Sequence, residues 1–223
     1  MTVHYESVQL ATLYLEAFDV PAPGAALGRD LWPRRPGVFI RKVQAAEAEA
    51  TGPLPAAREL VAGQFGLVPP WVKSASDAKL RSSKLVNARA ETASTSKNFH
   101  HAWVNAQRCI VPMMAFFVED WRSGKAVPTR ITRVDGKPMG VAGLWERWSG
   151  AGDETIVSFT LLTINANHHA LMHRYQQQGS EKRMPAVLNE GAYEAWLNAP
   201  PEKAREFMRA YPANWLTANP VEK

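Results

Sequence analysis

Apolar residues near the start of the chain follow the i, i+3, i+4, i+7 spacing of a helix, and later ones form the shorter runs typical of strands. The first pattern predicts a helix over residues 10–20, ended by the Pro-Ala-Pro-Gly segment at 21–24. Residues 38–41 predict a short strand after a Pro-Gly pair. An Ala/Glu-rich run at 45–50 leads into a loop at 51–55 that is rich in glycine and proline.

The middle of the chain is rich in strand signals. A continuous apolar run over residues 109–117 predicts a buried strand. Residues 129–134 and 139–148 flank an Asp-Gly pair at 135–136, which tolerates positive φ, so together they predict a β-hairpin. Residues 155–164 alternate like a strand and contain many β-branched side chains.

Proline and asparagine mark further boundaries. A Pro-Pro pair ends the apolar run at 64–68 and places Trp71 on a turn. Residues 184–188 predict another short strand. Two last helices are expected over 189–197, capped by its first residue, and over 201–208, which begins with proline.

The order of these elements favours one fold class. Strands dominate, and no βαβ alternation is visible, which argues against a doubly wound parallel sheet. We expect an α+β protein with a β-barrel-like core of antiparallel or mixed sheet and peripheral helices. The length of 223 residues and the ordinary globular composition favour a single domain over residues 1–223.

The charge distribution indicates an anionic partner. The formal net charge is +5, a modest excess. Between residues 79 and 108 the only acid is Glu91, whereas the bases are Lys79, Arg81, Lys84, Arg89, Lys97 and Arg108. This segment is a candidate phosphate-facing surface, although a solvated basic loop explains the charge equally well.

Targeting signals are not evident. The first residues lack a basic region followed by an apolar run, and no stretch approaches the length of a membrane span, so we expect a cytoplasmic protein without a membrane partner. The single cysteine, Cys109, permits no intramolecular disulfide and lies among apolar residues, where cysteine acts as a small hydrophobe.

The most informative segment is Asn-Ala-Arg-Ala-Glu-Thr at 87–92. It brings an amide (Asn87), a guanidinium (Arg89) and a carboxylate (Glu91) close together in a basic region. A guanidinium can hold a phosphate with two parallel hydrogen bonds. The alternative interpretation is that Glu91 and the residue after it merely cap a helix.

This segment resembles the hallmark of the SOS response-associated peptidase (SRAP) family. Other segments resemble family motifs and occur in the family's order: Phe65–Trp71, Arg108–Phe117, Gly140–Trp145, Thr160–Thr163 and Glu181–Pro185. The similarity spans nearly the whole chain. It implies an SRAP-like fold and an activity on single-stranded or junction DNA at abasic sites. In that chemistry, a cysteine exposed at position two captures the aldehyde of the site.

The resemblance assigns roles to individual residues. Asn87 matches the asparagine that holds the N-terminal cysteine, and Arg89 matches a phosphate-binding arginine. Trp71 resembles a base-stacking wedge, although a partly buried hydrophobe is the plainer interpretation. The remaining candidates for DNA contact are Lys97, Thr163, Glu91 and, at a position where the family commonly has Arg or Asn, His4.

The catalytic positions depart from the family pattern. Thr2 stands where the cysteine is expected. Val118 aligns with the catalytic glutamate and Gln176 with the catalytic histidine, in the longer form of the family's loop. Glu119 is adjacent, but a shift of one residue moves a strand side chain to the opposite face unless a bulge intervenes. His173 lies one turn earlier and is the other candidate for a catalytic role.

Two hypotheses follow. The first is a DNA-binding module with lost or reduced crosslinking and self-processing, that is, a pseudoenzyme. The alternative is an active SRAP-type peptidase and crosslinker that uses Thr2 after removal of Met1. No cofactor is expected, and no metal. His168, His169 and His173 lie close together, and His169 with His173 has the i, i+4 spacing of a metal pair, but this pair needs a third ligand and no local Glu supplies a His-Glu-x-x-His pattern. The sequence indicates no oligomeric state.

Overall fold

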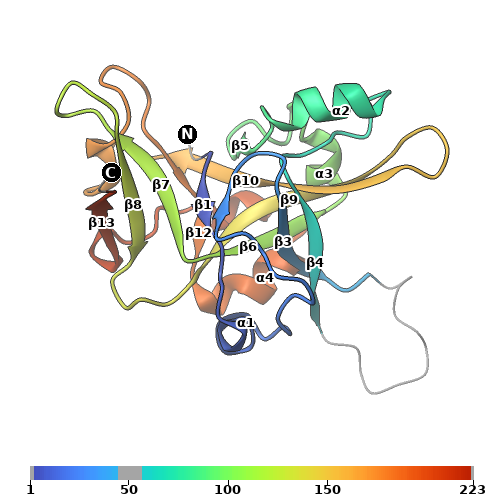
Figure 1. Cartoon of the computed structure of the whole chain (residues 1–223), viewed down its shortest axis with the longest axis horizontal. Coiled ribbons are helices and arrows are strands. Elements are labelled where there is room, and N and C mark those ends of the chain that lie inside the picture. Colours follow the sequence, from blue (N-terminus) through green and yellow to red (C-terminus); the bar gives the residue numbers. More distant parts are fainter. Residues whose placement is uncertain (1–2, 45–56, 222–223) are drawn as a thin grey trace.

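The computed structural model describes residues 3–44 and 57–221, and its strands form two sheets with short helices around them (Figure 1). The predicted run at 45–50 and the loop at 51–55 lie outside the described residues. No helix in the described ranges is long and apolar enough to cross a membrane. The architecture is α+β, as the order of predicted elements indicates.

The larger sheet contains a closed ring of five strands. These are β3 (Pro36–Lys42), β4 (Arg58–Phe65), β6 (Arg108–Met113), β9 (Met139–Ser149) and β10 (Thr155–Asn165). Pairing runs β10, β4, β3, β6, β9, and β9 pairs again with β10. The β10–β4 pair is parallel and the others are antiparallel, so the barrel is mixed. Closure leaves these strands without an unpaired edge between them.

Aromatic side chains fill the barrel. The ring of Phe159 lies 5.5 Å from that of Phe39 and 5.6 Å from that of Phe65, and all three are fully buried. Burying each such side chain stabilises the fold by about 1.5–3 kcal/mol. Tyr5 joins them, 5.1 Å from Phe65, and packs against Gly37, where an added Cβ would lie 3.0 Å from the Tyr5 hydroxyl. The beginning of the described chain is therefore anchored in the core.

The second sheet has five antiparallel strands in the order β13, β8, β7, β1, β2. Their bounds are Leu216–Pro220 (β13), Val127–Arg133 (β8), Ala115–Asp120 (β7), Tyr5–Glu6 (β1) and Asp30–Leu31 (β2). The short β1 lies between β7 and β2, with Tyr5 opposite Phe116. This sheet therefore holds the N-terminal segment beside β7.

The apolar run at 109–117 does not form one strand. It breaks at Met114, whose amide donates to the Glu6 carbonyl at 2.8 Å. The part before the break pairs with β9 in the barrel, and the part after it pairs with β1 and β8 in the second sheet. Both parts are buried, so hydrophobicity alone could not reveal the change of partner.

The hairpin predicted around residues 135–136 is wrong. The turn itself forms, with Gly136 at φ 71°, but β8 pairs with β7 and β13 whereas β9 pairs with β6, β10 and β12. Pro138 follows the turn and supplies no amide hydrogen where the first ladder bond would be needed. Arg133 instead donates to the Pro138 carbonyl at 3.3 Å and pairs with Asp135 and Glu190.

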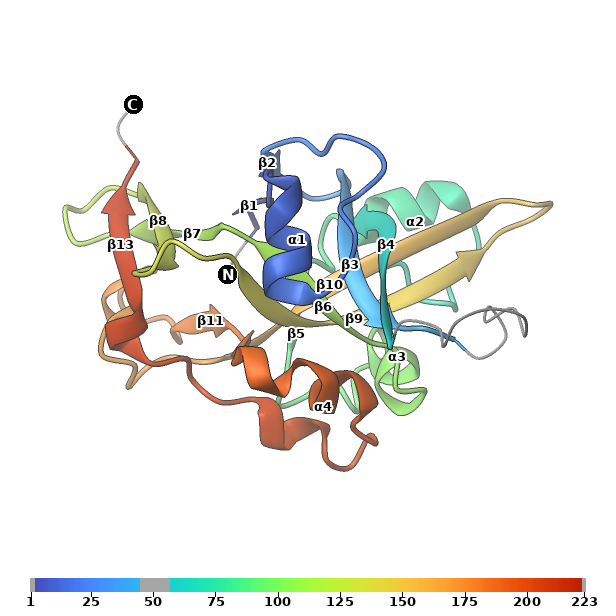
Figure 2. The same ribbon diagram turned by 90° about the horizontal axis from the view of Figure 1, so that it is seen from below.

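Short helices lie around the sheets. Helix α1 (Ala11–Phe18) confirms the predicted N-terminal helix and ends at Asp19 with φ 55°. The others are α2 (Ala75–Ser82), α3 (His100–Val104) and α4 (Tyr193–Asn198). Figures 1 and 2 show α1 and α4 outside the barrel and the β9–β10 hairpin projecting beyond it.

The two predicted C-terminal helices are shorter than expected. The first begins as a 3₁₀ turn at 190–192 before α4, and Asn189 makes no side-chain cap hydrogen bond. In place of the helix predicted over 201–208 there is only a 3₁₀ turn at Ala204–Phe207. The proline pair at 200–201 ends the first of these helices, because proline cannot continue it.

Three short strands extend the barrel at the carboxyl end of β10. β5 (Asn87–Arg89) runs parallel to β10, and β11 (Arg183–Pro185) pairs antiparallel to it. The chain then crosses at Ala186 to β12 (Val187–Leu188), which pairs with β9, so the strand predicted over 184–188 is split. Arg89 and Arg183 thus come to the same end of β10 from segments far apart in sequence.

A close approach fixes the segment between β4 and α2. Gly66 adopts φ +111°, and an added Cβ would lie 2.2 Å from the Ser82 carbonyl oxygen, so only glycine fits. The chain then passes through the Pro-Pro pair to Trp71, which lies on a turn as predicted. Ser74 caps α2 by accepting a hydrogen bond from the Asp77 amide at 3.2 Å.

Candidate functional site

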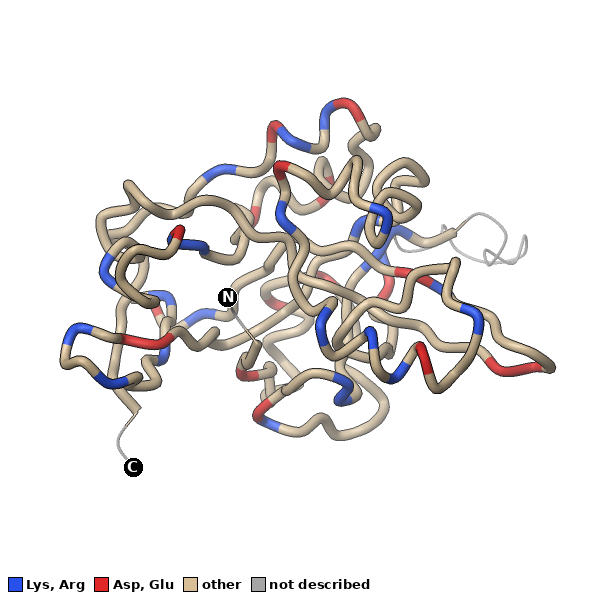
Figure 3. Tube along the Cα trace, turned by 90° about the horizontal axis from the view of Figure 1, so that it is seen from above, with Lys and Arg blue, Asp and Glu red and all other residues tan. Residues whose placement is uncertain are grey.

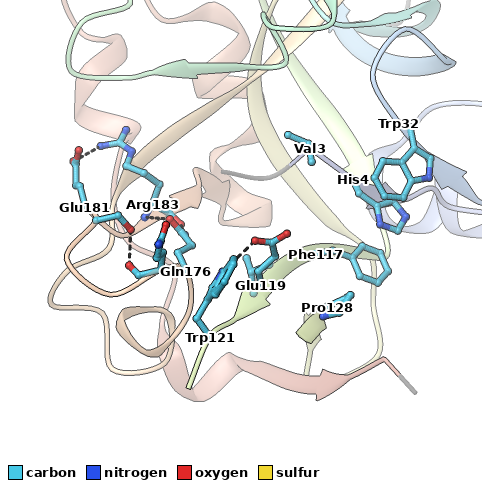
Figure 4. A pocket seen from close by; sticks show the side chains of 13 residues that line it. Val3, His4, Trp32, Phe117, Glu119, Trp121, Pro128, Gln176, Glu181 and Arg183 are labelled. Carbon is cyan, nitrogen blue, oxygen red and sulfur yellow. Dashed lines mark hydrogen bonds and ion pairs between the residues drawn. The ribbon is translucent and has the colours of Figure 1, made fainter. Parts of the chain in front are cut away.

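The N-terminal segment borders a pocket of about 440 Å³ between the second sheet and the loop that precedes β11. Its lining residues come from five parts of the chain: Val3, His4, Trp32, Phe117, Val118, Glu119, Trp121, Pro128, Gln176, Gln177, Ser180, Glu181 and Arg183. Figure 4 shows Val3 and Glu119 pointing toward the middle of the pocket from facing sides. Thr2 lies outside the described residues.

His4 fixes the course of the N-terminal segment. Its imidazole stacks between Trp32, 4.0 Å away at 11°, and Phe117, 3.9 Å away at 5°. Its Nε2 lies 2.7 Å from the Asp30 carboxylate, and its carbonyl accepts from the Phe117 amide at 3.1 Å. With both ring faces and one nitrogen engaged, His4 is fixed in place beside Val3, which lines the pocket.

The two faces of β7 differ at the pocket. Phe117 and Glu119 share one face, as alternation in a strand requires, and Glu119 is exposed into the pocket. Val118 lies on the other face, 6% exposed and part of the hydrophobic core. The Glu119 carboxylate accepts a hydrogen bond from Trp121 Nε1 at 3.1 Å. Of these two positions on β7, Glu119 and not residue 118 therefore brings an acidic group to the pocket.

Gln176 is locked in the pocket wall by backbone partners. It adopts φ 68°, and its amide donates to the Glu119 carbonyl at 2.7 Å. Its side chain donates to the Arg183 carbonyl at 2.5 Å and accepts from the Arg183 amide at 3.3 Å. Gln176 therefore ties the loop before β11 to β7 and leaves its side-chain amide engaged.

His173 does not face this pocket. It lies in a 3₁₀ turn at Met172–Arg174, is exposed, and its Nδ1 is 2.8 Å from the His169 carbonyl. His169 is buried, accepts from two backbone amides through Nδ1, and donates through Nε2 to the Tyr211 carbonyl at 2.7 Å. Within residues 3–44 and 57–221 no group of three or more acidic, histidine or cysteine side chains forms a metal site.

Four charged side chains alternate in sign next to the pocket. Arg183, only 5% exposed, pairs with Glu91 at 2.8 Å and with Glu181 at 2.9 Å. Glu181 also pairs with Arg89, whose side chain is half exposed. The network joins β5, β11 and the loop before β11. Its charges balance, so this wall is not the positively lined cleft that a simple phosphate groove would have.

The carboxyl group of Glu91 is held ionised by this network. Partial burial raises its pKa, but the hydrogen bonds and charge of Arg183 outweigh that effect and leave the pKa below its usual value. The amide of Asn165 also donates to Glu91 at 3.3 Å. The alternative interpretation, that Glu91 begins a helix, is wrong, because turns follow β5 until α3 begins at His100.

Thr163 and Asn87 lie behind this network. Thr163 is 1% exposed, and its carbonyl and hydroxyl accept from Arg183 at 2.7 and 3.1 Å. Asn87 begins β5 opposite Leu161, and it is not among the described residues that line the pocket. In this geometry Thr163 supports Arg183. The direct contact of Thr163 with DNA and the catalytic role of Asn87 both stay predictions.

Trp71 and Lys97 meet away from the pocket, beside α2. Trp71 is partly buried, packs against the small apolar cluster that includes Val68 and Trp148, and donates through Nε1 to the Lys97 carbonyl at 3.2 Å. Lys97 Nζ lies 4.4 Å from the centre of the indole ring. Neither residue is among the described lining of the pocket.

The charge and cysteine predictions can be located on the structure. Figure 3, which looks onto the side that α2 occupies in Figure 1, shows basic positions with acidic positions between them. The excess of base over acid is therefore local rather than a single continuous face. Cys109 is fully buried in β6, and burial raises the pKa of its thiol well above the usual value, which keeps it a thiol.

Several residues of the site have no signal in the sequence. Trp32 and Phe117 enclose His4, and Arg183 and Glu181 complete the ion-pair network, but their roles depend on partners in distant segments. The Glu181–Pro185 motif places Arg183 near the family's functional loop without indicating its partner. Only the resemblance could have suggested this segment, and only the structure shows the pairing with Glu91.

Fold and pocket together define an α+β protein with a closed mixed barrel and an N-terminal strand beside a pocket. The model of the family described as SOS response associated peptidase (SRAP) matches residues 26–223. The chain belongs to the SRAP family.

Relatives and solved structures agree with this assignment. The abasic site processing protein YoqW of Bacillus subtilis is 30% identical over 164 residues, which cover 71% of this chain and 67% of that protein. The abasic site processing protein HMCES of Gallus gallus is 25% identical over 185 residues, 74% of this chain and 53% of that protein. A crystal structure of a protein from Bordetella bronchiseptica is 42% identical, with a TM-score of 0.88 and coverage of 99% and 100%.

Proposed function

We propose that this protein binds single-stranded or junction DNA at or near abasic sites, with lost or reduced covalent crosslinking and self-processing. The observation that carries the proposal is the convergence on one pocket of the N-terminal segment, Glu119 and the loop before β11. The names of the relatives YoqW and HMCES, abasic site processing proteins, supply the class of substrate.

Affinity for DNA would come mainly from phosphate neutralisation. Arg89 presents a half-exposed guanidinium at the end of β10, and Lys97 presents an exposed ammonium beside Trp71. Each phosphate contact of this kind releases counterions, so binding should weaken as salt rises. The residues named in the family pattern as DNA contacts thus fall into two groups, one at the pocket and one beside α2.

Reduced covalent chemistry follows from the groups present. After loss of Met1, the α-amine of Thr2, with an ordinary pKa of about 7.7–8.0, could form an imine with an aldehyde. Closing that imine with the threonine hydroxyl gives an oxazolidine, which is more labile than the ring closed by a thiolate. Proton transfer by a histidine lacks support, since Gln176 holds the backbone of Arg183 and His173 is exposed outside the pocket.

The alternative is an active enzyme that uses Thr2. One observation favours it: the carboxylate of Glu119 points into the pocket from the same face as Phe117 and could serve as the proton-transfer group. The intact mass of the purified protein distinguishes the two cases. Loss of Met1 together with a denaturation-resistant DNA adduct would favour the active enzyme, whereas an unmodified mass after incubation would favour the binding module.

Fluorescence anisotropy tests the binding itself. A labelled single strand that carries one stable abasic analogue is titrated with protein across a salt series. We expect binding that falls with salt, and a weaker, flatter response for Arg89→Ala than for the wild type. Lys203→Ala, an exposed base between α4 and the last 3₁₀ turns, is the matched control. Absence of binding at low salt would end the proposal.

A further inference from the structure

Two cations cover the indole ring of Trp71. Lys97 Nζ lies 4.4 Å and Arg81 Cζ 4.7 Å from the ring centre, both within the range of a cation–π contact. The two positive charges therefore lie within about one Debye length (~8–10 Å) of each other at physiological salt. Two like charges held this close favour a polyanion whose successive charges can reach both.

The ring of Trp71 is held in place by its surroundings. It packs against the apolar cluster formed by Val68, Val72, Ala78 and Trp148, and its Nε1 already donates to the Lys97 carbonyl. Trp148 in turn donates through Nε1 to the Val72 carbonyl at 2.6 Å. Trp71 is therefore a fixed platform whose orientation does not depend on a ligand.

Contacts with residues other than Trp71 fix the positions of both cations. Arg81 Nε donates to both carboxylate oxygens of Asp77 at 2.8 Å, within one turn of α2, and its side chain is 45% exposed. Lys97 follows a series of turns in which the Ser96 amide donates to the Thr92 carbonyl at 2.9 Å, and the buried Phe99 anchors the segment. The structure thus holds an ammonium and a guanidinium against one indole ring, from two separate segments.

This arrangement conflicts with a stacking role. A base that stacks on Trp71 needs the ring surface that these cations already occupy, and displacing them would expose charge and lose two cation–π contacts. A phosphate needs no such displacement, because it binds the cations where they stand. The terminal guanidinium nitrogens of Arg81 extend beyond the Nε that contacts Asp77.

We propose that Arg81 and Lys97 form a phosphate clamp for a nucleic-acid strand, with Trp71 as the positioning residue beneath them. The clamp lies outside the pocket, so it would hold the backbone of the same strand away from the abasic site. The inference rests on the proposed DNA binding and deepens it. It adds Arg81 as a contact residue and gives Trp71 a role other than insertion between bases.

The test compares two labelled strands by anisotropy over a salt series. One is an ordinary oligonucleotide, and the other has the same number of phosphates but stable abasic spacers in place of every nucleotide. Arg81→Ala and Lys97→Ala should each weaken binding to both strands and reduce the salt slope by about 0.7, the value per phosphate contact on a single strand. Trp71→Leu should weaken binding to both strands by the same factor.

A double-mutant cycle distinguishes a positioning role of Trp71 from stacking of Trp71 on a base. In the background of the combined Arg81→Ala and Lys97→Ala substitutions, Trp71→Leu should have little further effect, because the residues it positions are gone. If Trp71→Leu weakens only the strand with bases, or if its effect adds fully to the others, Trp71 stacks on a base and the clamp is refuted. Unchanged salt slopes for Arg81→Ala and Lys97→Ala would also refute it.

Controls keep this result distinct from failure of the proposed function. Wild-type protein that binds neither strand would overturn the proposed DNA binding itself. Binding that depends on Arg89 but not on Arg81 or Lys97 would overturn only the clamp. Lys203→Ala should match the wild type on both strands, and thermal unfolding of each variant establishes that Trp71→Leu remains folded.

Discussion

At the scale of single residues, the pairing of Arg89 with Glu181 bears directly on the proposed binding of a DNA phosphate. The guanidinium that the family pattern assigns to phosphate contact is met by a carboxylate from the loop before β11. A DNA phosphate must compete with that carboxylate, because both accept the same hydrogen bonds. Glu181 also contacts Arg183 and Asn165, so the loop stays attached when Arg89 changes partner.

Glu181→Gln should therefore strengthen DNA binding. The amide keeps a hydrogen-bond acceptor for Arg183 but removes the negative charge that competes at Arg89. Exposed ion pairs contribute about 1 kcal/mol or less, so the gain in affinity should be at most about fivefold. Anisotropy titrations of a single strand check this, with Glu16→Gln on α1 as the control. Weaker binding by Glu181→Gln would mean that the carboxylate helps to hold the DNA.

Glu91 makes stability depend on pH at the acidic end. Its pKa is lowered in the folded state, so the ionised form is favoured by folding above the ordinary carboxyl pKa. That contribution is lost as the pH falls through the lowered pKa and Glu91 becomes protonated. We expect the difference in melting temperature between the wild type and Glu91→Gln to shrink between about pH 7 and pH 3. A difference that grows on acidification would contradict the sign of the shift.

At the scale of elements, β7 determines which side chain reaches the pocket. Its alternation places Phe117 and Glu119 in the pocket and Val118 in the core. The sequence predicts a strand here and leaves Val118 as the aligned position of the catalytic glutamate. The pattern of apolar residues could not show which face of β7 carries the Val118 side chain, because the apolar run is continuous and the break at Met114 changes the partner strand.

Substitutions on the two faces of β7 should lower the free energy of unfolding by different amounts. Val118→Glu places a carboxyl group among core side chains, and burying such a group without a partner lowers the free energy of unfolding by roughly 2–4 kcal/mol. Glu119→Gln keeps an acceptor for Trp121 and should change it by less than about 0.5 kcal/mol. Urea denaturation measures both. Equal, small effects would mean that the facing of β7 is assigned wrongly.

There is a physical reason why the sequence predicts some features of the structure and not others. Periodicity reports burial, so α1 and β10 are predicted well, and the Pro-Pro pair correctly predicts the turn at Trp71. It does not report which strands pair, so the Asp-Gly turn at 135–136 is mistaken for a hairpin although its glycine does adopt positive φ. Contacts such as Arg183 with Glu91 join residues 92 positions apart, and nothing local in the sequence encodes them.

At the scale of the whole molecule, the barrel and the second sheet each supply one side of the pocket. The barrel, closed by β9 and β10, supplies a rigid core and carries Arg89 and Arg183 at the end of β10. The second sheet holds the N-terminal segment and Glu119 on the other side of the pocket. The site is thus built where two sheets meet, and the stack around His4 holds Val3 and His4 in its lining.

The direct test of this arrangement is to restore the missing nucleophile. Thr2→Cys, with Met1 removal established by intact mass, is incubated with a single strand that carries one abasic site and then denatured. If the N-terminal segment lies in a DNA-binding pocket whose chemistry is limited by Thr2, the variant forms a stable adduct, Glu119→Gln slows its formation, and the wild type forms none. A Thr2→Cys variant that binds the strand but forms no adduct, or a wild type that forms one, would contradict the account.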